Sequence, residues 1–217
     1  MSTFSYLIDM FLHLDKHLGA IISQYGFETY LILFIIIFLE TGLVVTPFLP
    51  GDSLIFAAAA FTVSGELNIF ALVGILMVAA ILGDTVNYEI GRYFGDKLIK
   101  FGGGRLIKQE HLDKTNSFYE KYGGKTIIIA RFIPIVRTLA PFVAGIGKMT
   151  YKKFITFNAM GGVLWVTSVS ACGYFFGNIP VVKDNFSLVV IAIVLISIMP
   201  AVIEILRSKL KKTNELV

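Results

Sequence analysis

The fold of this chain is decided by the stretch Glu40-Thr-Gly-Leu-Val-Val-Thr-Pro-Phe-Leu-Pro-Gly-Asp52, which interrupts a long apolar segment. Glu40 and Asp52 are the only charged residues between positions 29 and 65. An ionisable side chain at membrane depth costs about 2.5–3.5 kcal/mol on insertion scales, so such residues are rare and usually functional. Proline removes a backbone donor and clashes with the preceding helical turn. The stretch therefore predicts two short helices around a polar break at Pro47, Pro50 and Gly51.

A second apolar segment, residues 126–147, repeats this pattern with basic residues. Its only charged residues are Arg131 and Arg137. Neither half of the first segment reaches the ~20 residues that a spanning helix needs. Two half-length helices around a break favour a re-entrant hairpin in each segment, whereas one kinked spanning helix followed by a loop is the alternative. The breaks expected in the second segment are Pro134, Pro141 and Gly145.

The composition is that of an integral membrane protein. Of 217 residues, 56% are hydrophobic and only 16% are charged, and the mean hydropathy is +0.77. Soluble domains carry nearer a quarter charged residues. The net charge of +4 is concentrated in residues 97–125 and 207–212. Beside apolar spans, such clusters indicate the cytoplasmic side of the membrane rather than nucleic-acid binding.

We expect one integral domain, residues 1–217, in a multi-pass protein of the bacterial inner membrane. The basic tail, and with it the C-terminus, is expected on the cytoplasmic side. Whether the N-terminal helix is interfacial or inserted stays open. The predicted parts are an amphipathic N-terminal helix (1–25), a first re-entrant hairpin (27–64), a transmembrane helix (67–95), a cytoplasmic loop (96–125), a second re-entrant hairpin (126–148), two transmembrane helices (154–176 and 186–206) and a basic tail (207–217).

Two short echoes suggest an internal repeat. Residues 46–51 and 140–145 share Pro-Phe-x-x-Gly, and residues 91–95 and 173–177 share Gly-x-x-x-Gly with aromatic filling. The first echo relates the two hairpins, and the second relates the transmembrane helices that follow them, so each hairpin and its following helix form one repeat. Counting sides of the membrane, the first hairpin enters from outside and the second from inside. The predicted fold is an all-α inverted repeat whose broken helices meet near the midplane.

Several motifs occur in a fixed order along the chain: Glu40 with Pro47-Phe-Leu-Pro-Gly-Asp52, Gly83-Asp84 with Tyr88, Gly91-Arg92, Arg131-Phe-x-Pro134-x-x-Arg137 and Ala144-Gly145. This ordered set resembles the DedA family, also described as SNARE-associated or VTT-domain proteins. The resemblance covers roughly residues 27–176. It implies an inner-membrane protein with two facing re-entrant hairpins, in a family whose bacterial members are linked to recycling undecaprenyl phosphate. Some members depend on proton motive force, and eukaryotic relatives scramble phospholipids.

The resemblance places the family's essential acidic pair on Glu40 and Asp52 and its essential basic pair on Arg131 and Arg137. These four residues are the predicted substrate site, because guanidinium groups bind a phosphate head through paired charged hydrogen bonds. An alternative is that the four charges form buried ion pairs that only fix the two hairpins together. The candidates for proton coupling are Glu40, Asp52 and Asp84. For Asp84, a network along its own helix with Tyr88 and Arg92 is the alternative.

The predicted function is a flippase for undecaprenyl phosphate or a related anionic lipid, coupled to protons. A proton-coupled exporter of small cations or drugs, and a phospholipid scramblase, are the alternatives. An enzyme is not expected, since the three histidines (His13, His17 and His111) lie in the N-terminal segment and the loop. We expect no catalytic residues, metal or cofactor. The expected partners are an anionic lipid and protons; a homo-oligomer, the exact substrate and the direction of transport stay open.

Overall fold

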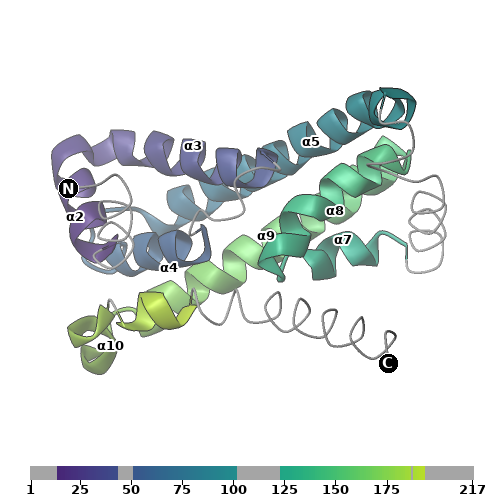
Figure 1. Cartoon of the computed structure of the whole chain (residues 1–217). Coiled ribbons are helices and arrows are strands. Elements are labelled where there is room, and N and C mark those ends of the chain that lie inside the picture. The colour runs from purple at the N-terminus through teal and green to yellow at the C-terminus, as the bar shows by residue number, and fades with distance from the viewer. Residues whose placement is uncertain (1–13, 44–50, 102–122, 187, 194–217) are drawn as a thin grey trace, which may run out of the picture.

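The structure is a computed structural model that describes residues 14–43, 51–101, 123–186 and 188–193. Within these ranges all regular secondary structure is helical, which confirms the predicted all-α class (Figure 1). The helices are α2 (Leu14–Tyr25), η1 (Gly26–Glu28), α3 (Thr29–Gly42), α4 (Gly51–Phe61), α5 (Ile69–Phe101), α7 (Lys125–Ala130), α8 (Pro134–Ile146), α9 (Tyr151–Phe176) and α10 (Pro180–Asp184).

Three helical stretches in the described residues are long and apolar enough to cross a membrane: His17–Gly42, Ile69–Phe94 and Tyr151–Phe176. The last two correspond to predicted transmembrane helices. The first was not expected, because the prediction separated an amphipathic N-terminal helix (1–25) from a re-entrant hairpin that begins at residue 27. In the structure Gly26 has φ +51°, a conformation that glycine adopts readily, and η1 connects α2 directly to α3.

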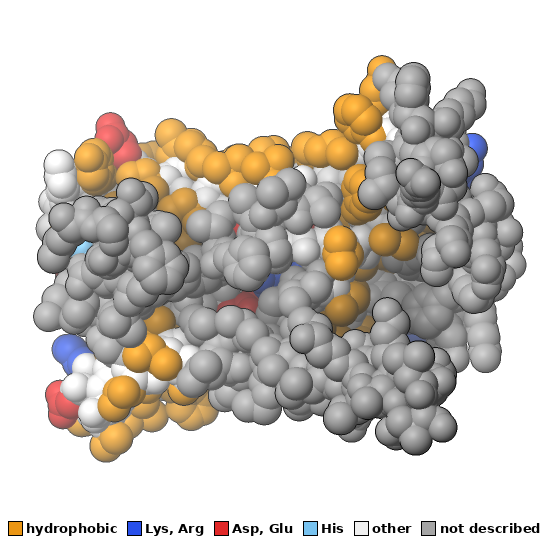
Figure 2. Space-filling model, viewed as in Figure 1, with side chains coloured by type: hydrophobic (Ala, Val, Ile, Leu, Met, Phe, Trp, Pro, Cys, Tyr) orange, Lys and Arg blue, Asp and Glu red, His pale blue; other side chains and the backbone are white. Residues whose placement is uncertain are grey.

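Much of the described surface is hydrophobic, as Figure 2 shows on one face. Exposed apolar side chains recur at every fourth residue on α3 and α5, so each helix presents an apolar stripe outward. Contiguous apolar surface of this kind indicates contact with lipid or another protein. The stripes consist of Leu31, Ile35 and Leu39 on α3 and of Val78, Leu82 and Val86 on α5.

The two interrupted segments approach each other from opposite ends of the molecule (Figure 1). In the first, α4 turns back beside α3. Gly51, at the start of α4, lies against the Glu40 carboxylate of α3, whereas Phe61, at the end of α4, lies beside Gly19 of α2. A Cβ at position 51 would collide with Glu40. Glycine at the start of α4 therefore allows this carboxylate to be buried.

The second segment is interrupted at residues 131–133, between α7 and α8. Ile133 is extended, with φ −119° and ψ 106°, as expected for a residue before proline. Pro134 then begins α8 at a position where its missing N–H costs nothing. The prediction of further breaks at Pro141 and Gly145 is wrong, because α8 continues through both. The sequence echo had equated residues 140–145, which lie inside this helix, with residues 46–51, of which the structure describes only Gly51.

Each half packs on the other through glycine. A Cβ on Gly145 of α8 would meet the backbone of Tyr88 on α5, and one on Gly173 of α9 would meet the backbone of Phe56 on α4. Small residues allow helices to approach this closely in lipid. The second helix of each interrupted segment thus lies against the long helix of the opposite half.

Several predicted features lie outside the described residues. They include the breaks at Pro47 and Pro50, the first part of the N-terminal helix, most of the loop 96–125, most of the last transmembrane helix and the basic tail. Where the membrane lies relative to the two interrupted segments stays a prediction.

Candidate functional site

Arg137 brings the two halves of the molecule together. It lies in the first turn of α8, and its side chain is 4% exposed. Its Nη2 donates to Glu40 Oε1 at 2.6 Å, and its Nη1 donates to Asp52 Oδ1 at 3.1 Å. Glu40 is in the last turn of α3 and is fully buried, whereas the Asp52 side chain, at the start of α4, is 19% exposed. Both predicted acids therefore bind the same predicted arginine.

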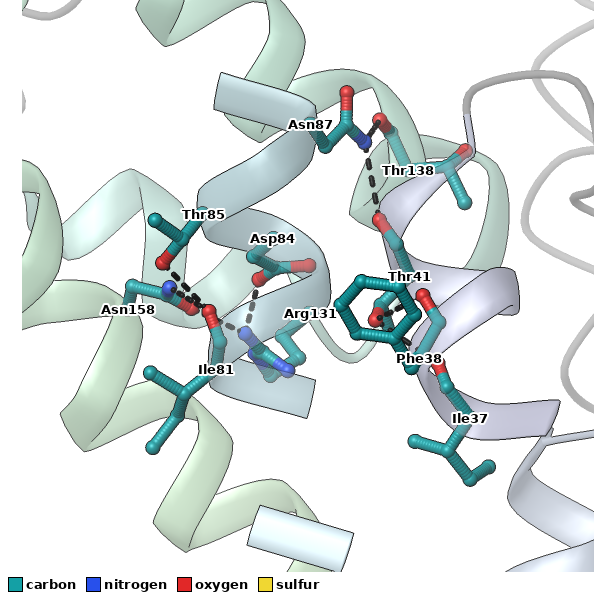
Figure 3. A network of polar contacts seen from close by, with 10 residues as sticks. All are labelled: Ile37, Phe38, Thr41, Ile81, Asp84, Thr85, Asn87, Arg131, Thr138 and Asn158. Carbon is teal, nitrogen blue, oxygen red and sulfur yellow. Dashed lines mark hydrogen bonds and ion pairs between the residues drawn. The ribbon is translucent and has the colours of Figure 1, made fainter. Parts of the chain in front are cut away.

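Arg131 has different partners from those that the sequence suggested. Its Nη2 donates to Asp84 of α5 and, at 2.5 Å, to Asn158 Oδ1 of α9 (Figure 3). Asn158 in turn donates from Nδ2 to the Ile81 carbonyl at 3.0 Å. The guanidinium and the Asp84 carboxylate are almost completely buried. Asp84 is thus part of the charged cluster.

The proposed helical network of Asp84, Tyr88 and Arg92 does not form. The Tyr88 hydroxyl donates to the Met149 carbonyl at 2.5 Å. Arg92 pairs instead with Glu89 on the surface, at 3.8 Å. Tyr88 therefore ties α5 to the segment before α9, and Arg92 lies on the surface outside the site.

Trp165 is a site residue that the sequence analysis missed. The Cζ atom of Arg137 lies 4.7 Å from the centre of the indole, and that of Arg131 lies 5.8 Å from it. The indole Nε1 donates to Asp52 Oδ1 at 2.7 Å. The ring is 1% exposed, so Trp165 is not an anchor at the membrane surface. The sequence did hold a signal for Trp165: it lies seven residues after Asn158, a spacing that places both on one face of a helix.

Asn87 joins the two interrupted segments directly. Its side-chain Nδ2 donates to the Thr41 carbonyl at the end of α3, at 3.1 Å, and to the Thr138 carbonyl in α8, at 2.8 Å (Figure 3). The amide is fully buried. A buried amide that bridges two elements fixes their relative position. Asn158 of α9 forms a similar cross-helix hydrogen bond, to the Ile81 carbonyl of α5.

The guanidinium groups retain unused donors. Among the described residues, Arg131 Nε and Nη1 and Arg137 Nε are buried without a hydrogen-bond partner. A buried donor left without a partner costs about 1–3 kcal/mol, and more when it is charged. The site therefore has the capacity to bind further acceptors. Gly161 and Gly162 of α9 lie close to Arg131, since a Cβ on either would be at van der Waals distance from its side chain, 3.5 and 3.8 Å.

The cluster has more acids than bases. Glu40, Asp52 and Asp84 are three carboxyl groups, and they face the two guanidinium groups of Arg131 and Arg137. If all five were ionised, the cluster would carry one excess negative charge in a poorly solvated region. Uptake of one proton would neutralise it, and an incoming anion would favour that uptake.

A cavity opens beside the cluster. Its volume is about 420 Å³, and Asp52 and Trp165 form part of its wall. In Figure 2, blue and red side chains are visible near the middle of the face shown. The other lining residues are Phe56, Phe132, Ser168, Val169, Cys172, Phe176, Val182, Val189 and Ile193. The cavity thus joins a charged end to an apolar body.

Comparison with known proteins agrees with the resemblance seen in the motifs. Residues 49–175 match the model of the VTT domain. The chain is 53% identical to Protein DedA of Escherichia coli over 211 residues, which is 96% of each chain. This chain belongs to the DedA family. It is also 42% identical to the uncharacterized membrane protein Rv0364 of Mycobacterium tuberculosis, over 80% of this chain and 77% of that protein.

A more distant DedA-family relative is the inner membrane protein YghB of Escherichia coli, which is 32% identical over 79% of this chain and 75% of its own length. No solved structure shows significant similarity to this chain. The VTT match includes Asp52, Asp84, Arg131, Arg137 and Trp165 but begins after Glu40. The site is therefore centred on the VTT domain, and α3 adds one carboxylate to it.

Proposed function

We propose that this protein moves an anionic lipid across the bacterial inner membrane, with undecaprenyl phosphate as the leading candidate, and that proton uptake accompanies the movement. The observation that carries the proposal is Arg137. It is buried where the two halves meet, is held by acids from the other half, and lies beside an apolar cavity. A lipid with a phosphate head needs this combination of a buried cationic site and an adjoining apolar space.

The head group would replace the acids on Arg137. In the structure Glu40 accepts a hydrogen bond from Nη2 of Arg137 and Asp52 accepts one from Nη1. Protonation of either acid weakens its bond to the guanidinium and lowers the excess negative charge of the cluster. A phosphate oxygen pair then binds the same two donors, an arrangement that suits the planar fork of arginine. Arg137 Nε and the free donors of Arg131 supply additional contacts.

The arrangement of the two segments supports movement through this site. Each interrupted helix ends in the middle of the molecule, and the two approach from opposite ends (Figure 1). If both are re-entrant, the charged cluster lies near the midplane of the membrane. Repacking of one half against the other would then expose the site alternately to each side.

The test is a leaflet-accessibility assay in proteoliposomes with fluorescent polyprenyl phosphate. We expect the protein to move label from the outer to the inner leaflet, faster when a pH gradient is imposed, and Arg137→Ala to abolish this movement while inserting normally. Equal rates for the wild type and Arg137→Ala would refute the anion site. Equal movement of a zwitterionic lipid would indicate a scramblase. An unchanged lipid distribution together with cation release would indicate the exporter.

A further inference from the structure

The cavity beside α9 has no role in the binding of a head group alone. We infer that it holds the hydrocarbon chain of the transported lipid, with the first carbons of the chain beside Trp165 and Phe132 and the rest along α9 toward Phe176. This inference rests on the proposed function, since the chain enters the cavity only when its phosphate binds at Arg137. It assigns the chain to a site on the protein rather than to the surrounding bilayer.

The first argument is continuity with the charged cluster. Asp52 lines the cavity, and its Oδ1 accepts hydrogen bonds from both Arg137 and Trp165. Trp165 also lines the cavity, and its ring stacks against Arg137. A phosphate that displaces Asp52 from Arg137 would therefore lie at the inner end of the cavity. A chain attached to that phosphate can enter it without a bend around a helix.

The second argument is the chemistry of the wall. Apart from Asp52, the polar groups are Ser168 and Cys172, and the Ser168 hydroxyl already donates to the Trp165 carbonyl at 3.0 Å. Such a wall has little to offer a polar solute. Its volume, about 420 Å³, falls within the range of roughly 300–1,000 Å³ typical of ligand sites. Val182, Val189 and Ile193 also line the cavity, so an occupant would contact apolar side chains of α9 and of the chain that follows it.

The chain carries two native reporters for this test. Trp165 is its only tryptophan and Cys172 its only cysteine. Trp165 is at the charged end of the cavity, and Cys172 is seven residues further along the same helix, with its side chain accessible. Tryptophan fluorescence therefore reports occupation of the charged end, whereas thiol labelling reports occupation of the apolar body.

The experiment uses purified full-length protein in detergent, with farnesyl phosphate as the probe and with inorganic phosphate and farnesol as controls. Fluorescence is titrated first, and the rate of Cys172 labelling by a small thiol reagent is then measured at saturation. We expect farnesyl phosphate to change the fluorescence and to slow labelling by about tenfold or more, as binding well above its Kd would require. Inorganic phosphate should leave labelling unchanged, and farnesol should protect far less.

The outcomes separate this inference from the proposed function. Suppose that farnesyl phosphate changes the fluorescence of the wild type but not of Arg137→Ala, and that Cys172 of the wild type stays unprotected. This result would support the anion site and overturn the chain site. If farnesyl phosphate caused no fluorescence change and gave no protection of Cys172, both the anion site and the chain site would be overturned. Equal protection by farnesol would show adsorption of any hydrocarbon and overturn the link to the head group.

A matched pair of variants tests whether filling the cavity weakens binding of the chain. Val169→Phe fills part of the cavity, whereas Val163→Phe adds the same side chain on the exposed face of α9. We expect Val169→Phe to weaken farnesyl phosphate binding by about tenfold, or 1.4 kcal/mol, without affecting dimethylallyl phosphate. Val163→Phe should bind both probes like the wild type. If Val169→Phe weakened the binding of both probes equally, or of neither, the inference would be overturned.

Discussion

The two buried arginines are only six positions apart in the sequence, yet their surroundings differ. Arg131 is held by Asp84 and Asn158, which belong to the long helices α5 and α9. Arg137 is held by Glu40 and Asp52, which lie at the facing ends of the shorter helices α3 and α4. The Asp52 side chain is also partly exposed, at 19%.

This difference indicates a division of labour between the arginines. The partners of Arg131 are fixed by helices that run the length of the described fold, so exchanging them would require the bundle to open. The partners of Arg137 come from helix ends beside a cavity, and they can move with less disruption. Under the proposed function, Arg137 would therefore be the site of exchange, and Arg131 would contribute a fixed positive charge and free donors.

The largest effect should come from removing the fixed partner. Asp84→Leu leaves Arg131 buried without a counter-charge, and we expect it to lower the free energy of unfolding by about 3–5 kcal/mol. Asp52→Ala should cost far less, because Arg137 retains Glu40 and Asp52 is partly hydrated. Thermal unfolding of the purified proteins measures both. Similar losses in the two variants would remove the distinction between the arginines.

A double variant sharpens this result. Asp84→Leu combined with Arg131→Met replaces the ion pair with apolar groups, which is often neutral for stability. We expect most of the lost stability to return while lipid movement stays absent, because the free donors of Arg131 are gone. Full transport by the double variant would show that Arg131 is purely structural.

The next largest effect, on transport, is expected for substitution of Arg137, whose acidic partners are proposed to exchange with the head group. Arg137→Lys keeps a positive charge but loses the planar pair of donors and the stacking on Trp165. Loss of a charged hydrogen bond costs about 1.5–3 kcal/mol, so we expect transport to fall by about 10- to 150-fold. Vesicle assays normalised to the amount of inserted protein measure it, and Arg92→Lys on the surface is the control. Wild-type transport by Arg137→Lys would mean that charge alone suffices.

The sequence identified Glu40, Asp52, Arg131 and Arg137 because charges are conspicuous in apolar segments. It did not predict their pairing, since which partner Arg131 takes depends on how α5 and α9 pack. Trp165 escaped notice for a related reason. An aromatic residue in an apolar helix is usually part of the core, and only the packed structure shows two guanidinium groups close to this ring.

The sequence predicted some helix ends correctly and others wrongly, because these also depend on how the chain packs. Proline in the first turn of a helix and proline in its interior look alike in a sequence. Pro134 starts α8, whereas Pro141 is accommodated inside it. The length of the N-terminal helical stretch depended on the φ of Gly26, which the sequence leaves free.

A smaller effect is expected for coupling to protons. Asp52→Asn keeps the shape of the side chain but removes an acid that binds Arg137 and lines the cavity. We expect transport by this variant to depend less on the pH of either compartment, while its stability changes by about 1 kcal/mol or less. Rates across a pH series, compared with those of the wild type and of Glu66→Gln on the surface, measure this. An unchanged pH profile would exclude Asp52 from coupling.

The smallest effect should follow from Trp165→Phe. This variant keeps an aromatic face against Arg137 and removes only the hydrogen bond from Nε1 to Asp52. A hydrogen bond of this kind contributes about 0.5–1.5 kcal/mol, so transport should change by no more than about tenfold. Because the lost bond holds Asp52 in place, Trp165→Phe should also shift the pH at which transport is half-maximal, whereas a purely packing role would leave that pH unchanged. If Trp165→Phe instead matched Arg137→Lys in severity, the indole would be a main part of the exchange site, and the contrast between the arginines would have to include it.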